Sequence, residues 1–324
     1  MRRLAPAQDR GSLPPMTQRP AILIMQRHLA PLSVFLESAY DVYRFWEGPP
    51  IEAAHDVRVL VVAGEFELDK ALIERLPNLS LIACFTSGYD GIDVDWCRAR
   101  GLPVTHAPAI NHEDVADHAL GLILAARRQI AEGDRQVRAG GWTPASKTIT
   151  PSMGGQTLGI VGLGAIGEAV ARRAEVMRMT VQWWAPRAKE AAWPRADSLL
   201  DLARAANVLV VACRADETNR GLISAEVIEA LGPSGLLVNV ARGQLVDEDA
   251  VIAALRDGRL GGAALDVFET EPTDAARWAT VPNTVLTPHT AGATTEAVQG
   301  MLMLLLQNLS AHFAGEPLKT PVVG

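Results

Sequence analysis

Residues 157–167 read TLGIVGLGAIG and carry the pattern that decides the fold. The apolar run Leu158–Val161 is typical of a buried strand, and Glu168–Val176 has the composition of a helix. The last three glycines of the stretch, spaced Gly-x-Gly-x-x-Gly, therefore fall at a turn from a strand into a helix, which is the context that a dinucleotide-binding loop requires. The stretch predicts a parallel α/β domain with a dinucleotide site.

Each glycine of this loop has its own physical reason. Gly162 permits the tight turn, Gly164 lets the backbone approach a pyrophosphate, and Gly167 lets the helix pack closely on the strand. A helix that begins near Ala165 and Ile166 presents its first N–H groups and the positive end of its dipole to the phosphates. We therefore expect these five residues to bind the cofactor.

The position of the loop indicates a second domain. In a simple Rossmann domain the loop follows the first strand of the chain, but here the strand before the loop begins only at residue 157. The residues before it have a series of their own, with strand-like apolar runs at Ala21–Met25, Val57–Ala63, Leu79–Thr86 and Pro103–His106. Strands that alternate with helical stretches indicate a parallel sheet.

We expect two Rossmann-like or flavodoxin-like α/β domains. A nucleotide domain, residues 108–292, is inserted in a discontinuous substrate domain, residues 21–107 and 293–324, and the chemistry is expected between them. Residues 1–20 are expected to be a flexible extension. One long helix is expected from about His112 to Gly140, and another over Met301–Phe313.

Composition and charge argue against several classes of protein. The net charge of −7 argues against nucleic-acid binding, and no apolar stretch is long enough for a membrane span. The three cysteines, Cys84, Cys97 and Cys213, are widely spaced, which suits a reduced cytoplasmic protein better than a disulfide framework. Without an HExxH motif or paired cysteines, no metal site is expected.

Three polar residues follow the loop in the order arginine, glutamate, histidine. Arg242 comes after the apolar stretch Gly235–Ala241, so we expect it at the carboxyl end of a strand, where its planar fork can hold a carboxylate and a carbonyl oxygen. His289 follows the run Thr284–Leu286, and an imidazole can deliver or accept a proton near neutral pH. A glutamate between them, Glu269 or Glu271, would accept a hydrogen bond from the other ring nitrogen and raise the affinity of the histidine for a proton.

The most specific stretches are Thr157–Gly164, Asn239–Val246, Ala264–Pro272 and Leu286–Gly292. Through them the chain resembles, from about Ala21 to its C-terminus, the D-isomer-specific 2-hydroxyacid dehydrogenases, most of all their glyoxylate/hydroxypyruvate reductase branch. The resemblance implies NAD(P)H-dependent reduction of a small 2-oxo acid, glyoxylate or hydroxypyruvate, to the D-2-hydroxy acid. It also implies catalytic roles for Arg242, Glu271 and His289, and a homodimer.

The resemblance assigns further residues to the cofactor. Asp266 would face the nicotinamide or the substrate side. The backbones of Val240, Arg214 and Ala291 would line the cofactor, although Arg214 replaces the proline or small residue that is usual there. Asn111 matches the start of the interdomain helix of the family, which its side chain can cap.

The resemblance also assigns substrate contacts to the first domain. The stretch Thr86–Asp90 is similar to the Gly-x-Gly-Tyr-Asp turn of the family, with threonine in place of the first glycine. Ser87 and Gly88 would bind the substrate carboxylate through their backbone N–H groups, and Arg242 would bind it from the other domain. Gly64, after the run Val57–Ala63, is a further substrate candidate or a plain turn glycine.

The second strand of the nucleotide domain, Thr180–Trp184, runs out at Ala185. An acidic residue there would hydrogen-bond the ribose of NAD, whereas Arg187 can pair with a 2′-phosphate and Lys189 can assist it. We expect NADP(H) to be preferred, with NAD(H) possible. A plain role as solvated surface cations stays open for both side chains.

Other functions also stay open at this point. A nucleotide-sensing interaction protein could use the same scaffold, as the corepressor relatives do, although this compact chain lacks long tails with interaction motifs. Formate or phosphite oxidation is a weaker alternative, because the formate relatives have glutamine where Glu271 stands. Trp142 resembles a tryptophan that some relatives place in the pocket of a neighbouring subunit, with simple packing as its other interpretation.

Overall fold

The computed structural model describes residues 19–48 and 54–322, which form two compact units. The first unit runs up to Ala107 and resumes at Leu302, and the second holds Pro108–Met301. The expected boundaries were 107/108 and 292/293, so the second boundary lies later than expected, inside helix α11 (Thr295–Ala314). Residues 1–18, most of the expected extension, lie outside the described residues.

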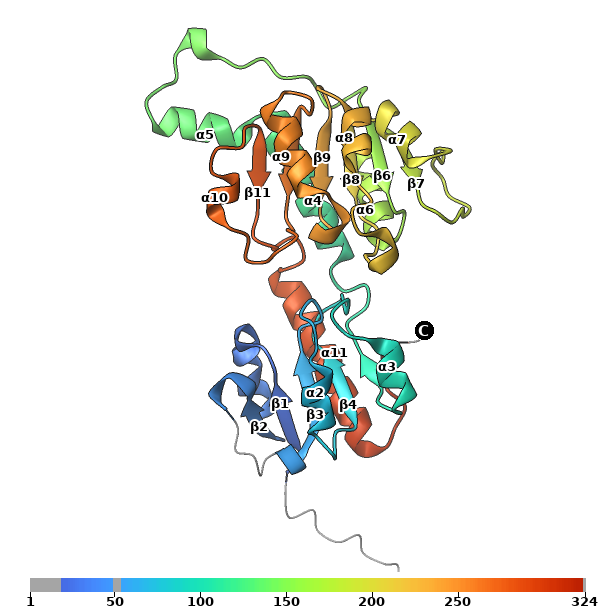
Figure 1. The fold of residues 1–324 in the computed structure, drawn as a ribbon. Helices are drawn as coiled ribbons and strands as arrows, with labels where there is room; N and C mark the ends of the chain where they lie inside the picture. The colour runs from blue at the N-terminus through green and yellow to red at the C-terminus, as the bar shows by residue number, and fades with distance from the viewer. Residues whose placement is uncertain (1–18, 49–53, 323–324) are drawn as a thin grey trace, which may run out of the picture. The chain divides into compact units, whose positions relative to one another are not determined.

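The first unit holds a five-stranded parallel sheet in the order β2-β1-β3-β4-β5 (Figure 1). Its strands are β1 (Ala21–Ile24), β2 (Asp41–Arg44), β3 (Val57–Val62), β4 (Leu81–Cys84) and β5 (Val104–Thr105), and its helices α1 (Ser33–Leu36), α2 (Lys70–Glu74) and α3 (Val94–Ala99). This strand order is that of a flavodoxin-like fold. Strand β2 was not expected, because its sequence DVYR has no apolar run and its residues are only half-buried.

The second unit holds a six-stranded parallel sheet in the order β11-β10-β9-β8-β6-β7. Its strands are β6 (Thr157–Val161), β7 (Thr180–Trp184), β8 (Val208–Val211), β9 (Leu236–Asn239), β10 (Gly262–Leu265) and β11 (Thr284–Leu286). Its helices are α4 (His112–Arg127), α5 (Ile130–Arg138), α6 (Ala165–Val176), α7 (Leu199–Ala205), α8 (Ala225–Leu231), α9 (Glu248–Arg256), α10 (Ala275–Trp278) and the start of α11. The expected pair of parallel α/β domains is confirmed.

Helices pack on both faces of the second sheet, and its central strands β8, β9 and β10 are therefore buried along their whole length. Strand β8 illustrates this, because its side chains alternate between the two faces. Val208 and Val210 pack in the cluster that contains α4 and α6, whereas Leu209 and Val211 pack in the cluster formed with α7, α8 and α9. Both clusters are almost free of solvent, and they fix the strands from which the loops of the site extend.

The single helix expected from His112 to Gly140 is wrong. Helix α4 ends at Arg127, Gln129 adopts a left-handed conformation with φ of 51°, and α5 then begins at Ile130. The Arg127 guanidinium donates to the carbonyl oxygens of Ser234 (2.7 Å) and Asn207, which fixes the end of α4 against the sheet. A left-handed glutamine carries no sequence signal, since glycine or asparagine usually marks such a position.

Candidate active site

Candidate residues from six loops meet at one edge of the second sheet. All six strands are parallel, so their carboxyl ends point the same way. The loops that follow these ends carry, from β6 to β11, Gly162, Arg187, Arg214, Val240 with Arg242, Asp266, and His289. The glycine loop follows β6, which lies between β7 and β8. The chain order reverses there, at the switch point where ligands bind in such sheets.

Two glycines of the loop are required by the packing of the protein itself, and the third is not. A Cβ on Gly162, whose φ is +93°, would lie 2.5 Å from Cα of Cys213, and a Cβ on Gly167 would lie 2.2 Å from the carbonyl oxygen of Gly162. A Cβ on Gly164 would meet no protein atom within 4 Å. Helix α6 begins at Ala165 without a side-chain cap. This cradle fits a pyrophosphate, which the first N–H groups of α6 would hold.

The loop after β7 carries cations and no carboxylate at its start. Ala185 is half-buried, and Arg187 and Lys189 are exposed. Lys189 makes an ion pair of 2.5 Å with Glu168 in the first turn of α6, so its charge is already compensated. Of the two cations expected there, Arg187 is therefore the better candidate for a 2′-phosphate.

Arg242 is held by a buried asparagine at the end of β9. The Asn239 side chain, 1% exposed, accepts the N–H of Ala241 (3.0 Å) and donates to the carbonyl oxygen of Arg242 (2.9 Å). The guanidinium of Arg242 donates to the Ala241 carbonyl (2.7 Å). A Cβ on the next residue, Gly243, would lie 1.8 Å from the carbonyl carbon of Phe268. The arginine loop therefore packs directly on the backbone that leads to Glu271.

Glu271 and His289 form a pair. Nδ1 of His289 lies 2.6 Å from Oε2 of Glu271, and Oε1 of Glu271 accepts the N–H of Phe268 (2.9 Å). The hydrogen bond to Glu271 raises the pKa of His289 above its usual value, against the opposing effect of burial. Burial works to raise the pKa of Glu271, but the hydrogen bonds from His289 and Phe268 outweigh it and hold that pKa below its usual value.

The charge of Arg242 acts on both members of this pair, lowering the pKa of each. Because Nδ1 of His289 is committed to Glu271, Nε2 is the nitrogen that can exchange a proton with a substrate. The three residues together offer a cation, a proton donor and a carboxylate that orients the donor. This is the set needed to protonate a carbonyl oxygen while a neighbouring carboxylate is held.

Asp266 holds the turn that carries His289. Its carboxylate is 1% exposed and accepts three hydrogen bonds, from the Thr287 hydroxyl (2.6 Å), the Thr290 N–H (2.9 Å) and the Ala291 N–H (2.9 Å). Its carbonyl oxygen accepts the N–H of His289 (2.7 Å). These contacts explain how His289 keeps its left-handed φ of 54°. A contact of Asp266 with nicotinamide stays a prediction.

The candidate substrate residues of the first unit lie after two neighbouring strands, β3 and β4. The Thr86 hydroxyl accepts the N–H of Gly64 (2.9 Å) and donates to the carbonyl oxygen of Gly88 (2.9 Å). A Cβ on Gly64 would lie 2.0 Å from that same oxygen, so the two turns touch. The Ser87 hydroxyl donates to the Ala107 carbonyl (2.7 Å). The N–H of Gly64 is thus committed to Thr86, which leaves the turn at Ser87 and Gly88 as the better carboxylate site.

Comparison with known proteins supports the family resemblance seen in the sequence. Residues 120–291 match the model of the D-isomer specific 2-hydroxyacid dehydrogenase NAD-binding domain. The chain is 40% identical over 305 residues to glyoxylate/hydroxypyruvate reductase A of Arabidopsis thaliana, covering 91% of this chain and 97% of that protein. It is 39% identical to hydroxyphenylpyruvate reductase of Plectranthus scutellarioides, with the same coverage. The chain belongs to the D-isomer specific 2-hydroxyacid dehydrogenase family.

A solved structure of this family has the same fold. The NADPH-dependent glyoxylate/hydroxypyruvate reductase of Sinorhizobium meliloti, in complex with NADP and malonate, superposes with a TM-score of 0.87 at 33% identity. The match covers 94% of this chain and 97% of that one. The protein is therefore an NAD(P)-dependent oxidoreductase of the 2-hydroxyacid dehydrogenase type.

One cation of this dehydrogenase, Arg195, was not predicted from the sequence. Residues 194–196 pair with Trp183 of β7, through Trp183 N–H to Pro194 (3.1 Å) and Ala196 N–H to Trp183 (2.8 Å). The pairing brings the exposed Arg195 to the end of β7, where its guanidinium donates to the Ala185 carbonyl (2.8 Å). Arg195 thus lies beside the position at which NAD-dependent relatives need an acid. Nothing in the sequence marks it, because ten residues separate it from Ala185.

Asn111 precedes α4 of the dehydrogenase as expected but does not cap it with its side chain. A Cβ on Gly292 would lie 2.1 Å from the Asn111 amide nitrogen, so the side chain packs against the glycine that follows the His289 turn.

Among the residues that the structure describes, none of the helices is long and apolar enough to span a membrane. The same residues hold no cluster of three or more potential metal ligands.

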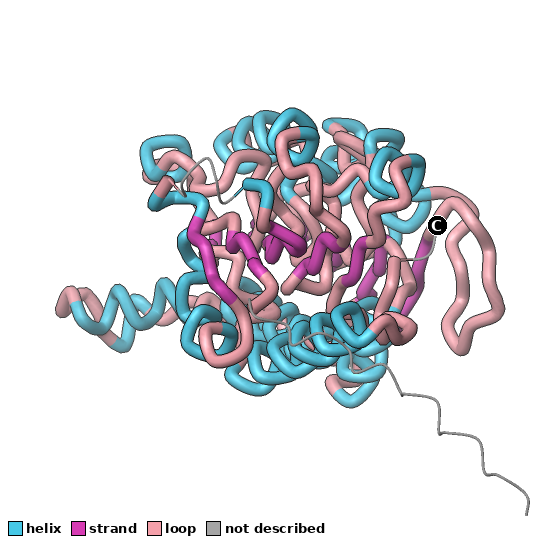
Figure 2. The backbone as a smooth tube through the Cα atoms, turned by 90° about the horizontal axis from the view of Figure 1, so that it is seen from below, coloured by secondary structure: helices cyan, strands magenta, loops and turns pink. Residues whose placement is uncertain are grey.

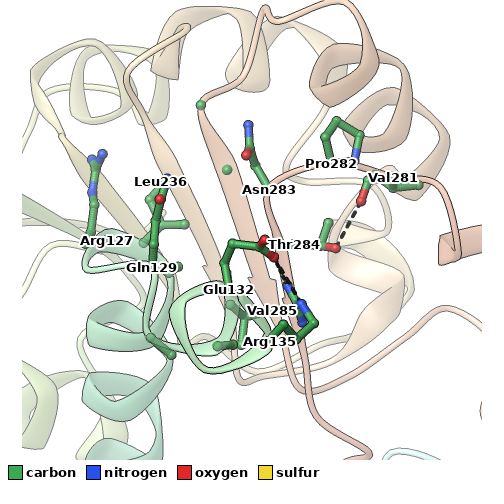
Figure 3. Close-up of a pocket in the computed structure, with 15 residues that line it drawn as sticks. Arg127, Gln129, Glu132, Arg135, Leu236, Val281, Pro282, Asn283, Thr284 and Val285 are labelled. Atoms are coloured by element: carbon green, nitrogen blue, oxygen red, sulfur yellow. Dashed lines mark hydrogen bonds and ion pairs between the residues drawn. The ribbon is translucent and has the colours of Figure 1, made fainter. Parts of the chain in front are cut away.

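A cavity of about 460 Å³ lies away from the candidate site (Figure 3). Its lining includes Leu236, Gly262 and Thr284, the first residues of β9, β10 and β11, and therefore belongs to the amino edge of the sheet. Figure 3 shows the ion pair of Glu132 and Arg135, from α5, among the lining side chains. Since the chemistry lies at the carboxyl edge, this cavity is not the substrate site.

Proposed function

We propose that this dehydrogenase reduces a small 2-oxo acid, glyoxylate or hydroxypyruvate, to the D-2-hydroxy acid with NADPH. The observation that carries the proposal is the Glu271–His289 pair beside Arg242, at the same sheet edge as the glycine loop. Bound NADPH supplies a hydride to the carbonyl carbon. The carbonyl oxygen then needs one proton, which Nε2 of His289 is able to give.

Each residue of the set has a distinct task in this proposal. The Arg242 fork binds the carboxylate and the carbonyl oxygen of the acid and stabilises the negative charge that develops on that oxygen. Glu271 raises the pKa of His289, which favours the protonated ring, and it orients that ring. In the reverse direction the neutral imidazole accepts the proton of the hydroxyl group. In the first unit, the turn at Ser87 and Gly88 is the candidate for binding a carboxylate.

The choice of a small acid rests on the relatives. The Arabidopsis thaliana and Sinorhizobium meliloti proteins are glyoxylate/hydroxypyruvate reductases, and the second is NADPH-dependent. The Plectranthus scutellarioides protein, nearly as similar, is a hydroxyphenylpyruvate reductase, so an aryl 2-oxo acid is the second substrate class to test. NADPH is favoured over NADH because Arg187 and Arg195 flank Ala185, where no carboxylate repels a 2′-phosphate.

A homodimer is part of the proposal. We call α5 and the loop after it, residues 130–150, the arm, which projects from the rest of the second unit (Figures 1 and 2). Ile149 and Trp142 in the arm are 96% and 57% exposed, and Ile130 and Val137 are exposed as well. Exposed apolar side chains of this kind mark an interaction surface, and the cavity of Figure 3 at the base of α5 offers a receptor for them.

The dimer has a direct test. Light scattering after size exclusion should give twice the mass of 34.7 kDa for the wild type. Ile149→Asp with Trp142→Asp should shift the protein toward the single-chain mass, whereas Val176→Asp, another exposed apolar residue outside the arm, should not. A wild type of single-chain mass would overturn this part.

We also place the enzyme in the cytoplasm, since its three cysteines are all unpaired thiols.

The activity is tested by initial rates of NADPH and NADH oxidation with glyoxylate, hydroxypyruvate, pyruvate and 4-hydroxyphenylpyruvate. Fast NADPH oxidation with the first two acids is the expected result. Preference for the aryl acid would keep the reaction and change the substrate class. Tight NADPH binding without turnover of any acid would contradict the proposal and favour a protein that senses the nucleotide by binding alone.

A further inference from the structure

His118 is a histidine of the second unit for which the proposed reaction has no role. It lies in helix α4, which packs on β9, β10 and β11, and its side chain is 26% exposed. Its Nε2 lies 3.0 Å from the hydroxyl oxygen of Thr287 and 3.4 Å from Oδ1 of Asp266. Sequence spacing gave no reason to single it out, because its two contacts are 169 and 148 residues away.

The contacts of Thr287 determine where His118 carries a proton. The threonine hydroxyl has one hydrogen, which it donates to Oδ1 of Asp266 over 2.6 Å. Asp266 accepts two further backbone N–H groups and so acts as an acceptor throughout. With its hydrogen spent on Asp266, the hydroxyl can only accept from His118. Nε2 of His118 must therefore carry a proton and donate it.

This network ends at the turn that holds the proposed proton donor. Thr287 and Asp266 together fix residues 287–291, and His289 in that turn has a left-handed backbone that its own conformational preference would not maintain. The Asp266 side chain is almost fully buried, so a nearby donor also lowers the cost of burying this polar group. His118 supplies that donor from a different helix.

We propose that His118 is a positioning residue of the active site: its Nε2–H, given to Thr287 beside Asp266, holds the turn in which His289 meets Glu271. The inference rests on the proposed function, because it assigns His289 the role of proton donor. His118 itself touches neither substrate nor cofactor in this account. Its effect reaches the reaction only through the geometry of His289.

Two variants separate hydrogen bonding from packing. His118→Leu removes the donor, and His118→Gln keeps an N–H near the position of Nε2. His118→Leu should lower kcat for the 2-oxo acid by about tenfold through misplacement of His289, while the Kd of NADPH changes less than about twofold. His118→Gln should recover most of the wild-type kcat. His112→Leu is the matched control and should keep wild-type kcat, because this histidine of the same helix contacts Ala109 and Glu113 near the start of the helix.

A second readout does not depend on turnover. Nitrogen-15 chemical shifts of the imidazoles, followed against pH, should show a proton on Nε2 of His118. They should also show a raised pKa for His289 in the wild type and a lower pKa for it in His118→Leu. Absence of wild-type turnover with these shifts intact would refute the proposed function and leave the network standing. Wild-type kcat in His118→Leu, equal losses in His118→Gln and His118→Leu, or an Nε2 of His118 without a proton would each overturn the inference.

Discussion

Nδ1 of His289 lies 2.6 Å from Oε2 of Glu271, at the carboxyl edge of a six-stranded parallel sheet. Two separate sets of hydrogen bonds hold the two residues of the pair in place. Phe268 N–H holds the second oxygen of Glu271, and Asp266 holds the turn of His289. The pair is therefore positioned before any substrate arrives, which is how an enzyme limits the reorganisation needed in the reaction.

Glu271→Gln should move the pH dependence of reduction to lower pH. Glu271 raises the pKa of His289, so the protonated ring persists to a higher pH in the wild type, and reduction should fail only as the pH rises through that raised pKa. Without the carboxylate the alkaline limb should begin earlier, and kcat at pH 7 should fall by about tenfold or more. Profiles of kcat against pH check this. An alkaline limb at the same pH in both proteins would contradict the pairing.

Arg187→Ala and Arg195→Ala should each reduce kcat/KM for NADPH by about tenfold or more, since each removes a charged hydrogen bond to a 2′-phosphate. The value for NADH should stay within about twofold. Arg204→Ala, an exposed arginine of the same unit paired with Asp201, is the control. If the NADPH/NADH ratio is unchanged in the double variant of Arg187 and Arg195, the cation argument for NADPH is wrong.

Thr86→Val should raise KM for the 2-oxo acid by about tenfold while kcat and the Kd of NADPH stay near wild type. Valine keeps the shape of threonine but loses the hydroxyl that joins Gly64 to Gly88, so the carboxylate turn loses a restraint and the buried N–H of Gly64 loses its acceptor. Thr86→Ser keeps the hydroxyl and should restore KM. A valine variant with wild-type KM would show that the link does not shape the substrate site.

Gly162→Ala and Gly164→Ala should fail in different ways. Alanine at Gly162 must adopt φ of +93° and place Cβ 2.5 Å from the Cys213 backbone, which should reduce the free energy of unfolding by about 2–3 kcal/mol or more. Alanine at Gly164 meets no protein atom, so stability should stay within about 0.5 kcal/mol of the wild type. Its NADPH affinity should fall instead. Urea unfolding and cofactor titration of both variants separate the two roles. Full NADPH affinity in Gly164→Ala would remove that glycine from the cofactor site.

Much of the scaffold could be predicted from the sequence. Apolar runs such as Leu158–Val161 are short and end at a clear glycine turn, so their strands are recognisable from the chain alone. Because parallel strands share one carboxyl edge, placing Arg242 and His289 after two of these runs already placed them near each other. The pairing of His289 with Glu271 rather than with exposed Glu269 came from the resemblance to the family.

The remaining features depend on contacts between distant segments. The end of α4 is set by the Arg127 side chain binding carbonyl groups of two loops, and Gln129 then adopts a conformation that its residue type does not signal. Arg195 reaches the end of β7 only because residues 194–196 pair with that strand. His118 reaches Thr287 only because α4 crosses the sheet. Local sequence patterns cannot report such contacts.

The proposed reaction depends above all on His289 as the proton donor for a 2-oxo acid. The most direct measurement is the rate of NADPH oxidation with glyoxylate in single turnovers, for the wild type and His289→Asn, across pH, with the Kd of NADPH measured in parallel. His289→Asn should be slower than the wild type by a factor of about 10²–10⁴, and its rate should no longer fall at alkaline pH, while its Kd for NADPH stays near wild type. A variant that keeps its rate within tenfold, or that retains the wild-type pH profile, would contradict this role of His289.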